Sequence, residues 1–285
     1  MALIPQRSGG SPEEQARTAR NLVRGCGLTE ADVDRILDYQ RTDELSFAEA
    51  ALRLGMVDQS DIDVAMGKPE PAQSEADGVA AAELLSVHDP YHSYTEKLRG
   101  LRQEILARRK SDHENQLAIV SAQQGDGRSR LAAEMAVVFA QMKQPTLLVD
   151  ADLRHPRQHE LFGLDNEVGL AQALQDGATP RVHGVQGVDD LFVLSSGERQ
   201  GNPMELITGS AFGELLQGFG RRFKHVIVDT PDAGRYYDAL AVASHCGSVL
   251  MAVREHHTPL AASRELVRRV QTTRAAILGV ALVRR

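Results

Sequence analysis

The sequence is poor in the residues that mark several specialised protein classes. It contains no tryptophan, 4% aromatic residues and only two cysteines, Cys26 and Cys246, which lie far apart. Two distant cysteines exclude a disulfide-built scaffold and a cysteine zinc site. The ten histidines do not pair with cysteine or carboxylate at ligand spacing, so we expect no histidine metal site either.

Long apolar runs are also missing. No stretch of eighteen apolar residues is present, and the first residues, MALIPQRSGGSPEEQ, lack the basic start and apolar core of a signal peptide. We therefore expect a cytoplasmic chain without a membrane span of its own.

Charge is distributed unevenly along the 285 residues. Residues 1–90 carry seventeen acidic and eight basic side chains, whereas residues 91–285 carry 22 and 24. An acidic front part argues against nucleic acid as a partner. The nearly neutral remainder suits an enzyme domain with a local anion site.

Composition and periodicity divide the chain into four segments. Residues 1–10 are polar and rich in Gly and Ser, which predicts a disordered tail. Residues 11–68 predict a small all-α domain, in which Thr29 can cap one helix, Ser46 and Glu49 form a capping box, and a short third helix starts near Ser60. Residues 69–87 are predicted to be a linker, because Pro, Glu and Ser dominate its start.

The last segment, 88–285, predicts an α/β domain. It begins with a helix over 91–110, and short apolar runs then alternate with helical stretches. This pattern indicates a mostly parallel sheet with helices on both faces. The predicted strands lie at 117–120, 146–149, 191–194, 225–228, 248–253 and 276–280.

The first strand runs into a glycine-rich loop. Residues Gln124, Gly125, Asp126, Gly127, Arg128, Ser129 and Arg130 follow the frame of a P-loop, with Arg128 in the usual lysine position. Glycines let backbone N–H groups surround phosphate oxygens, a helix N-terminus favours the negative charge, and the Ser129 hydroxyl is suited to Mg²⁺. A plain strand–turn–helix connection is the alternative interpretation.

Carboxylates close two further apolar strands. Asp150 and Asp152 follow the run Leu147–Val149, and Asp229 follows Val226–Val228. At the carboxyl edge of a sheet such groups hold Mg²⁺ or orient a nucleophile. Taken one at a time, they could equally be acids of surface turns. Together with the P-loop they predict a nucleotide site.

These motifs resemble those of the bacterial tyrosine kinases. Asp150-x-Asp152-x-Arg154 after an apolar strand is similar to the additional Walker-type motif of that family. The stretch beginning Asn202-Pro203 is similar to the family's NPxELL segment. The likeness covers roughly residues 88–285, and the N-terminal part looks like the exopolysaccharide-operon branch of the family.

The helix before the first strand carries another family motif. Glu96, Arg99 and Arg102 match E-x-x-R-x-x-R at every position. In the family this helix packs subunits into a ring, so the resemblance implies a homo-oligomer with these residues at its interface. An exposed helix with ion pairs three residues apart is the alternative.

The resemblance implies a function and roles for the motif residues. It implies ATP and Mg²⁺ as cofactors, with Gln124–Arg130 around the phosphates and with Ser129, Asp150 and Asp229 at the metal. Asp152, Asp150 and Arg128 would be the catalytic residues, Asp152 being the general base. The implied activity is protein-tyrosine (auto)phosphorylation that regulates exopolysaccharide chain length and export.

The resemblance also implies a partner, a membrane-bound chain-length determinant that recruits the chain to the inner face of the membrane. The chain departs from the family at Arg128 and in lacking a C-terminal tyrosine cluster, since its five tyrosines are Tyr39, Tyr91, Tyr94, Tyr236 and Tyr237. Two alternatives therefore stay open. One is a catalytically weak or inactive P-loop regulator of polysaccharide assembly, and the other is a partition-type ATPase.

Overall fold

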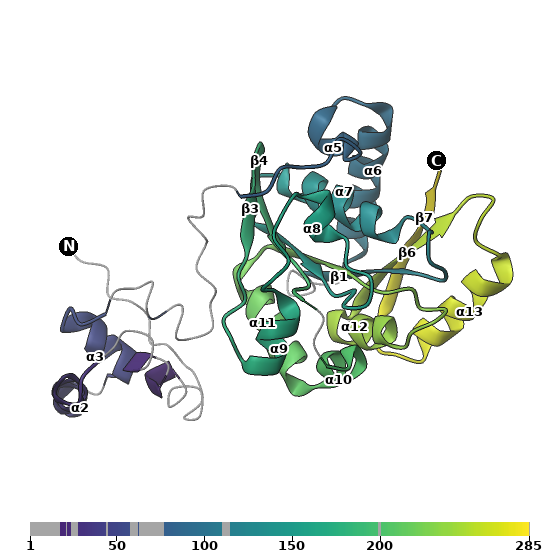
Figure 1. Ribbon diagram of the computed structural model, residues 1–285. Helices are drawn as coiled ribbons and strands as arrows, with labels where there is room; N and C mark the ends of the chain where they lie inside the picture. Colours follow the sequence, from purple (N-terminus) through teal and green to yellow (C-terminus); the bar gives the residue numbers. More distant parts are fainter. Residues whose placement is uncertain are drawn as a thin grey trace. The chain divides into compact units, whose positions relative to one another are not determined.

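The computed structural model divides the chain into two compact units, residues 1–70 and 71–285 (Figure 1). It describes residues 18–20, 22–23, 28–43, 45–57, 62, 77–109, 115–198 and 201–284. The expected disordered tail, 1–10, lies outside the described residues. So does nearly all of the short helix expected near Ser60.

Two helices of the N-terminal unit begin at the predicted caps. The Thr29 hydroxyl accepts the N–H of Asp32 at 3.3 Å. The Ser46 hydroxyl accepts the N–H of Glu49 at 3.3 Å, while the Glu49 carboxylate accepts the N–H of Ser46 at 2.9 Å, so the capping box is confirmed. The helices are α2 (Glu30–Asp43) and α3 (Phe47–Arg53). Their apolar residues Ile36, Phe47, Ala50 and Ala51 form a small core together with Leu22, Val57 and Ile62.

A seven-stranded sheet forms the centre of the C-terminal unit, in the order β3-β4-β2-β5-β1-β6-β7. Every neighbouring pair is parallel except β3 and β4. The strands are β1 (Gln116–Ser121), β2 (Thr146–Asp150), β3 (His183–Val185), β4 (Val188–Leu194), β5 (His225–Asp229), β6 (Ser248–Arg254) and β7 (Ala276–Val283). Six of them coincide with the predicted apolar runs, and only the three-residue edge strand β3 was not predicted.

Helices cover both faces of this sheet, as predicted. In Figure 1, α5 to α8 lie on one side and α9 to α13 on the other. Strand β1 shows why its sequence is continuously apolar: Leu117 and Ile119 enter one core, while Ala118 and Val120 enter the opposite core. The helices are α5 (Leu85–His88), α6 (Ser93–Arg108), α7 (Arg128–Ala140), α8 (Gln158–Leu161), α9 (Leu170–Asp176), α10 (Pro203–Thr208), α11 (Ser210–Arg222), α12 (Asp238–Cys246) and α13 (Leu260–Gln271).

The predicted linker, 69–87, extends too far into the C-terminal unit. Gly78 forms a bridge to β3, and Leu84 is fully buried in the core beneath α7. The buried carboxylate of Glu134 accepts the N–H of Ser86 at 2.9 Å. The second half of the predicted linker is therefore packed structure. Its sequence, GVAAAELLSV over residues 78–87, is mostly apolar, but the run is too short and too continuous to show the period of a helix or a strand.

Candidate functional site

The three motif-bearing strands are neighbours in the sheet. Strand β5 lies between β1 and β2, and all three run in the same direction. In this register Asp150, the last residue of β2, stands beside Asp229, the last residue of β5. The topology therefore brings the three motifs to one edge of the sheet, where α/β folds bind their ligands.

The loop after β1 has the backbone geometry of an anion-binding turn. Gly125 and Gly127 adopt positive φ angles of 86° and 83°, and Gly127 is the N-cap of the thirteen-residue helix α7. A Cβ atom at Gly127 would lie 2.9 Å from Cγ1 of Val283, so a side chain is excluded on two grounds. The backbone N–H groups that begin α7 thus form a site for negatively charged oxygens.

The outer side of this loop is braced by other elements. Asp126 is buried, and its two carboxylate oxygens accept the N–H of Gln123 at 2.9 Å and the Thr258 hydroxyl at 2.6 Å. Arg254 donates to the carbonyl of Gly125 at 2.9 Å. The Asp126 side chain therefore holds the loop in shape, and only its backbone can face a ligand.

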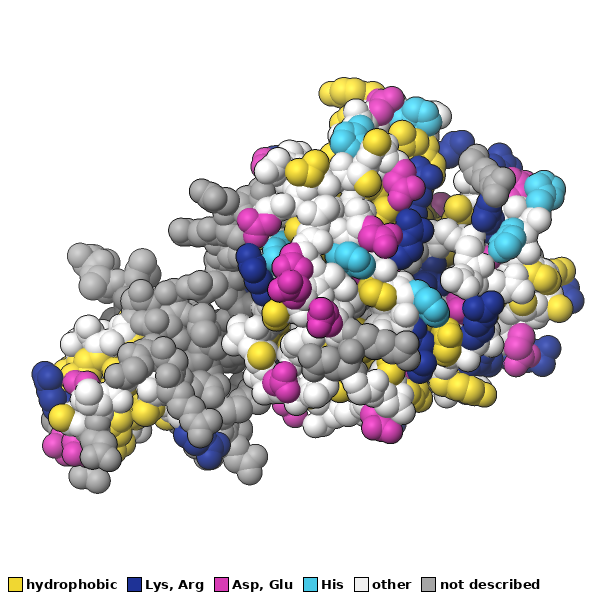
Figure 2. Space-filling model, viewed as in Figure 1, with side chains coloured by type: hydrophobic (Ala, Val, Ile, Leu, Met, Phe, Trp, Pro, Cys, Tyr) yellow, Lys and Arg dark blue, Asp and Glu magenta, His cyan; other side chains and the backbone are white. Residues whose placement is uncertain are grey.

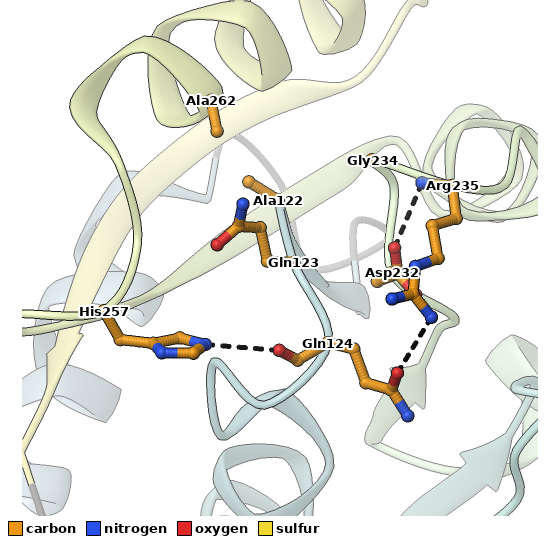
Figure 3. Close-up of a pocket in the computed structure, with 8 residues that line it drawn as sticks. All are labelled: Ala122, Gln123, Gln124, Asp232, Gly234, Arg235, His257 and Ala262. Atoms are coloured by element: carbon orange, nitrogen blue, oxygen red, sulfur yellow. Dashed lines mark hydrogen bonds between the residues drawn. The ribbon is translucent and has the colours of Figure 1, made fainter.

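A pocket of about 420 Å³ opens beside the start of the loop (Figure 3). Arg235 donates to the side-chain oxygen of Gln124 at 2.9 Å, and a ring nitrogen of His257 lies 3.4 Å from the Gln124 carbonyl. The pocket is lined by Ala122, Gln123, Gln124, Asp232, Gly234, Arg235, His257 and Ala262. It provides polar space next to the anion-binding turn.

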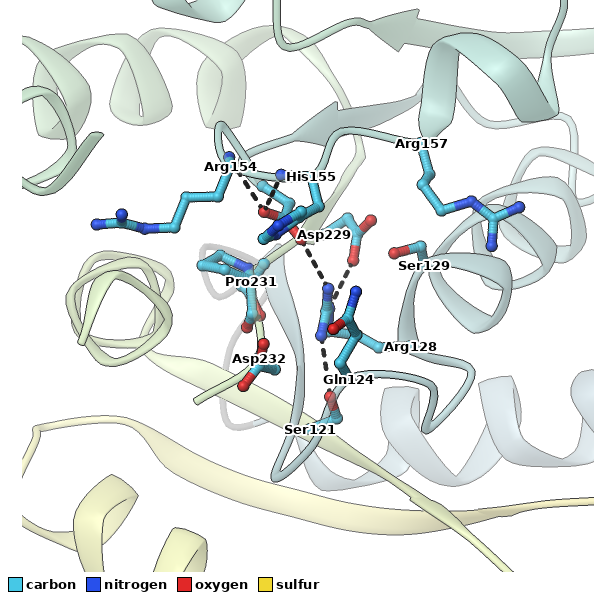
Figure 4. Close-up of polar contacts among 12 residues, drawn as sticks. Ser121, Gln124, Arg128, Ser129, Arg154, His155, Arg157, Asp229, Pro231 and Asp232 are labelled. Atoms are coloured by element: carbon cyan, nitrogen blue, oxygen red, sulfur yellow. Dashed lines mark hydrogen bonds and ion pairs between the residues drawn. The ribbon is translucent and has the colours of Figure 1, made fainter. Parts of the chain in front are cut away.

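Arg128 lies at the centre of the carboxylate cluster (Figure 4). Its Nη2 donates to Asp152 at 2.9 Å, its Nε donates to Asp229 at 3.1 Å, and its Nη1 donates to the Ser121 hydroxyl at 3.0 Å. The side chain is 9% exposed. Arg128 thus connects all three motifs, with its charge directed at carboxylates.

Asp150 organises the loop that follows β2. Its side chain is fully buried and accepts the N–H groups of Asp152, Arg157 and Gln158 at 3.2, 3.0 and 2.9 Å. Burial raises the pKa of Asp150 well above its usual value, and the nearby charge of Asp229 raises it further. Both oxygens are thus engaged with backbone, and a role as metal ligand remains a prediction.

Asp152 combines a charged partner with two backbone partners. It accepts the N–H groups of Arg154 and His155 at 3.2 and 3.0 Å in addition to the Arg128 bond. Burial raises the pKa of Asp152, and the positive charge of Arg128 partly offsets that rise. An aspartate with a raised pKa is better suited to accept a proton than an ordinary surface carboxylate.

The donor set at this edge fits a magnesium ion. The Ser129 hydroxyl at the start of α7 points toward the carboxylate cluster in Figure 4, so hydroxyl and carboxylate oxygens are both present at this edge. Within the described part of the chain, no three His, Cys, Asp or Glu side chains form a preformed metal cage. Mg²⁺ is usually held by one or two protein oxygens together with substrate phosphates and water, so a magnesium site at this edge remains a prediction.

The side chains of two residues that the sequence predicted for the phosphate site and the oligomer interface contact other parts of the same unit. The Arg130 guanidinium lies 3.6 Å from Glu134 and over the ring of Tyr94, so its side chain is directed at α6 and α7 rather than at the loop. Arg102 is buried and donates to the carbonyl of Val138 within the same unit. The side chain of Arg102 is thus engaged inside its own unit, and its place at an oligomer interface remains a prediction.

Glu96 and Arg99 keep positions that an interface could use. Glu96 is exposed, and it forms an ion pair with Arg99. Arg99 also donates to the side chain of Gln141 at 3.0 Å. The predicted oligomer contact therefore remains a prediction for these two residues.

The surface around the site is rich in basic side chains. On the face shown in Figure 2, Lys and Arg gather mainly in the half of the C-terminal unit that carries β6, β7 and α13. His155, Arg157, Arg235 and His257 are all exposed. Such a surface favours negatively charged ligands.

The most important side chain that sequence reasoning missed is Gln158. It is fully buried and donates to Asp229 at 2.8 Å and to the carbonyl of Ser129 at 3.0 Å. It thereby joins the first turn of α7 to the end of β5. A lone glutamine at the start of a four-residue helix carries no signal in the sequence, and the same holds for the single residues Arg235 and His257.

Comparison with known proteins identifies relatives of the C-terminal unit. CapB from Staphylococcus aureus is 31% identical over 189 residues, which cover 64% of this chain and 82% of CapB. The tyrosine-protein kinase YwqD from Bacillus subtilis is 30% identical, over 69% of this chain and 83% of YwqD. Other relatives are longer: the match spans 24% of the tyrosine-protein kinase Wzc from Salmonella typhi. No family model matches the chain.

The C-terminal unit is also similar in structure to solved proteins of this kind. The chimerical protein CapA2B2 superposes with a TM-score of 0.67 at 32% identity, covering 79% of this chain and 97% of that one. The kinase domain of the Escherichia coli tyrosine kinase ETK gives the same TM-score at 28% identity, covering 71% and 80%. Sequence, fold and the arrangement of the three motifs lead to one conclusion: the chain belongs to the family of bacterial tyrosine-protein kinases.

Proposed function

We propose that this chain is an ATP- and Mg²⁺-dependent protein-tyrosine kinase that regulates the chain length and export of an exopolysaccharide. The observation that carries the proposal is the convergence of the glycine loop, Asp152 and Asp229 around Arg128 at one sheet edge. Phosphoryl transfer rests on positioning and charge stabilisation, and these are what this edge offers.

Each part of the site has a role in this proposal. The N–H groups that follow Gly125 hold the phosphates, and the Ser129 hydroxyl and Asp229 would hold a Mg²⁺ ion, which would neutralise phosphate charge. Asp152 accepts the proton of the tyrosine hydroxyl. The pocket beside Gln124 leaves space for an incoming side chain. Gln158 keeps Asp229 oriented through its 2.8 Å hydrogen bond.

The proposal also includes a membrane-bound partner and a site of action at the membrane. The part of the chain that the structure describes contains no helix with the length and hydropathy of a membrane span. We propose that a membrane-bound chain-length determinant recruits the chain to the inner membrane face, and that copies of the chain assemble into a ring. The exposed Glu96 side chain and Arg99 are the residues proposed for that contact.

A non-catalytic regulator of polysaccharide assembly is the second candidate. It is favoured by one observation: all three guanidinium nitrogens of Arg128 already donate to protein oxygens. An arginine whose charge is shared with two carboxylates offers less positive charge to a phosphate, which would weaken transfer.

Phosphotyrosine formation separates the two candidates. The purified chain is incubated with ATP and Mg²⁺, with and without a tyrosine-containing copolymer, and compared with Asp152→Asn. A surface variant, Asp189→Asn, removes an exposed carboxylate whose only described ion pair is with Lys143, and serves as the matched control. A kinase gives a phosphotyrosine signal that survives in the control and falls at least about 100-fold in Asp152→Asn. Nucleotide binding without any phosphotyrosine supports the regulator instead.

A further inference from the structure

The carboxylate oxygens of the site already accept hydrogen bonds from the protein itself. Asp150 accepts only backbone N–H groups, and one oxygen of Asp152 does the same. The other Asp152 oxygen and one Asp229 oxygen accept from Arg128, and the remaining Asp229 oxygen accepts from Gln158. Every oxygen of the three side chains therefore has a donor.

Only one of these donors carries a charge. Asp152 and Asp229 are 2% and 0% exposed, so their negative charges are removed from water. A buried carboxylate is stable only when a cation or several hydrogen bonds replace its hydration. Arg128 is the cation that these two carboxylates share.

The geometry of the contact requires arginine. Nη2 and Nε of one planar group reach two different aspartates at 2.9 and 3.1 Å, while Nη1 reaches Ser121 at 3.0 Å. A guanidinium holds such a fixed fork, whereas the ammonium of lysine is a compact point charge on a flexible stem. Lysine at this position would not span both carboxylates and the hydroxyl in the same way.

We propose that Arg128 is the built-in counter-ion of the Asp152–Asp229 pair and competes with divalent metal for these two carboxylates. Mg²⁺ favours carboxylate oxygens, and two of those it could use are already bonded to Arg128. The protein without nucleotide then has little affinity for Mg²⁺ at this edge. The inference concerns Mg²⁺ binding to the nucleotide-free chain, so it can be tested separately from kinase activity.

Metal binding to the nucleotide-free full chain tests this proposal. Mg²⁺ is titrated calorimetrically into the wild type and Arg128→Met, and thermal unfolding is followed with and without Mg²⁺. We expect no saturable site in the wild type. In Arg128→Met we expect a saturable site at least about tenfold tighter, and a melting temperature that rises with Mg²⁺.

The matched control is Arg154→Met. Arg154 is also a mostly buried arginine in an ion pair, at 2.6 Å, but its partner is the single carboxylate of Asp238. We expect this variant to gain no saturable site. An equal gain in Arg154→Met, a saturable site in the wild type, or a folded Arg128→Met without any gain would each overturn the proposal.

A second variant covers the case in which Arg128→Met does not fold. Arg128→Lys keeps the positive charge but loses the fork, so we expect a smaller gain in Mg²⁺ affinity than for Met. Circular dichroism establishes that the variant is folded. If folded Arg128→Lys binds Mg²⁺ no better than the wild type, the competition does not exist.

Discussion

His225 shows how burial changes a single ionisable side chain at the start of β5. The residue is 2% exposed, and its ring packs against Phe139, with ring nitrogens 3.0 Å from Arg109 and 2.7 Å from Gln144. Burial and the charge of Arg109 lower the pKa of His225 to about 3. The neutral ring can accept from Arg109 and donate to Gln144, whereas a protonated ring cannot accept.

This arrangement predicts a pH dependence of stability. In the unfolded chain His225 has a pKa near 6.5, so the unfolded state binds more protons as the pH falls below that value. The contribution of His225 is therefore complete above pH 6.5 and is lost progressively toward pH 3. Between pH 6.5 and 5 we expect a loss of about 1–2 kcal/mol of unfolding free energy.

Urea unfolding of the wild type and His225→Gln at several pH values measures this loss. Other titrating groups, His245 among them, are common to both proteins, so the difference between the two curves isolates His225. The difference should shrink as the solution is acidified. Parallel curves would show that His225 does not titrate abnormally.

At the residue scale the sequence predicted the polar side chains of the site better than their partners. Asp150, Asp152 and Asp229 were expected at one edge because each follows a buried strand, and the register places Asp150 beside Asp229. Contacts such as Gln158 to Asp229 span 71 positions of the chain. A pattern within a few neighbouring residues cannot predict a contact between residues so far apart in the sequence.

Helix α5 illustrates how one element depends on another. Its four residues cannot form a stable helix alone. The Glu134 carboxylate on α7 is fully buried and accepts the N–H groups of Leu85 and Ser86 and the Ser86 hydroxyl. A carboxylate at a helix start also complements the helix dipole.

We therefore expect Glu134→Ala to destabilise the C-terminal unit by about 2–4 kcal/mol, because it leaves buried donors without an acceptor. The N-terminal residues of α5 should lose hydrogen-exchange protection first. Glu160→Ala, which removes an exposed glutamate paired at 3.5 Å with Arg157, is the control and should change stability by less than about 0.5 kcal/mol. Equal effects of the two variants would contradict this role of Glu134.

The sequence predicted those helices and strands whose positions depend on neighbouring residues of the chain. The caps at Thr29 and Ser46, the helix over 91–110 and six of seven strands agree with the sequence, because side-chain periodicity and capping act over a few residues. Strand β3 and helix α5 were not predicted. Both are too short to show a period, and tertiary contacts stabilise them.

For the whole molecule, the division at residue 70 predicts that the C-terminal unit folds alone. A chain of residues 71–285 should unfold cooperatively and keep its nucleotide affinity. A chain of residues 89–285 should be less stable by about 3–5 kcal/mol or more, because it lacks the fully buried Leu84 and Ser86. Denaturant unfolding of both proteins measures the difference, and equal midpoints would show that residues 77–87 behave as the linker that the sequence predicted.

The sequence alone determined the family, the α/β class and the edge of the sheet that carries the site. These follow from short-range patterns: apolar runs, glycines in a turn, and acids at strand ends. The tertiary structure decided that Arg128 faces Asp152 and Asp229, that Asp126 braces the loop, and that Arg102 is buried. The direction of a long side chain depends on which charges and cavities surround it, and distant segments supply those only after the chain has folded.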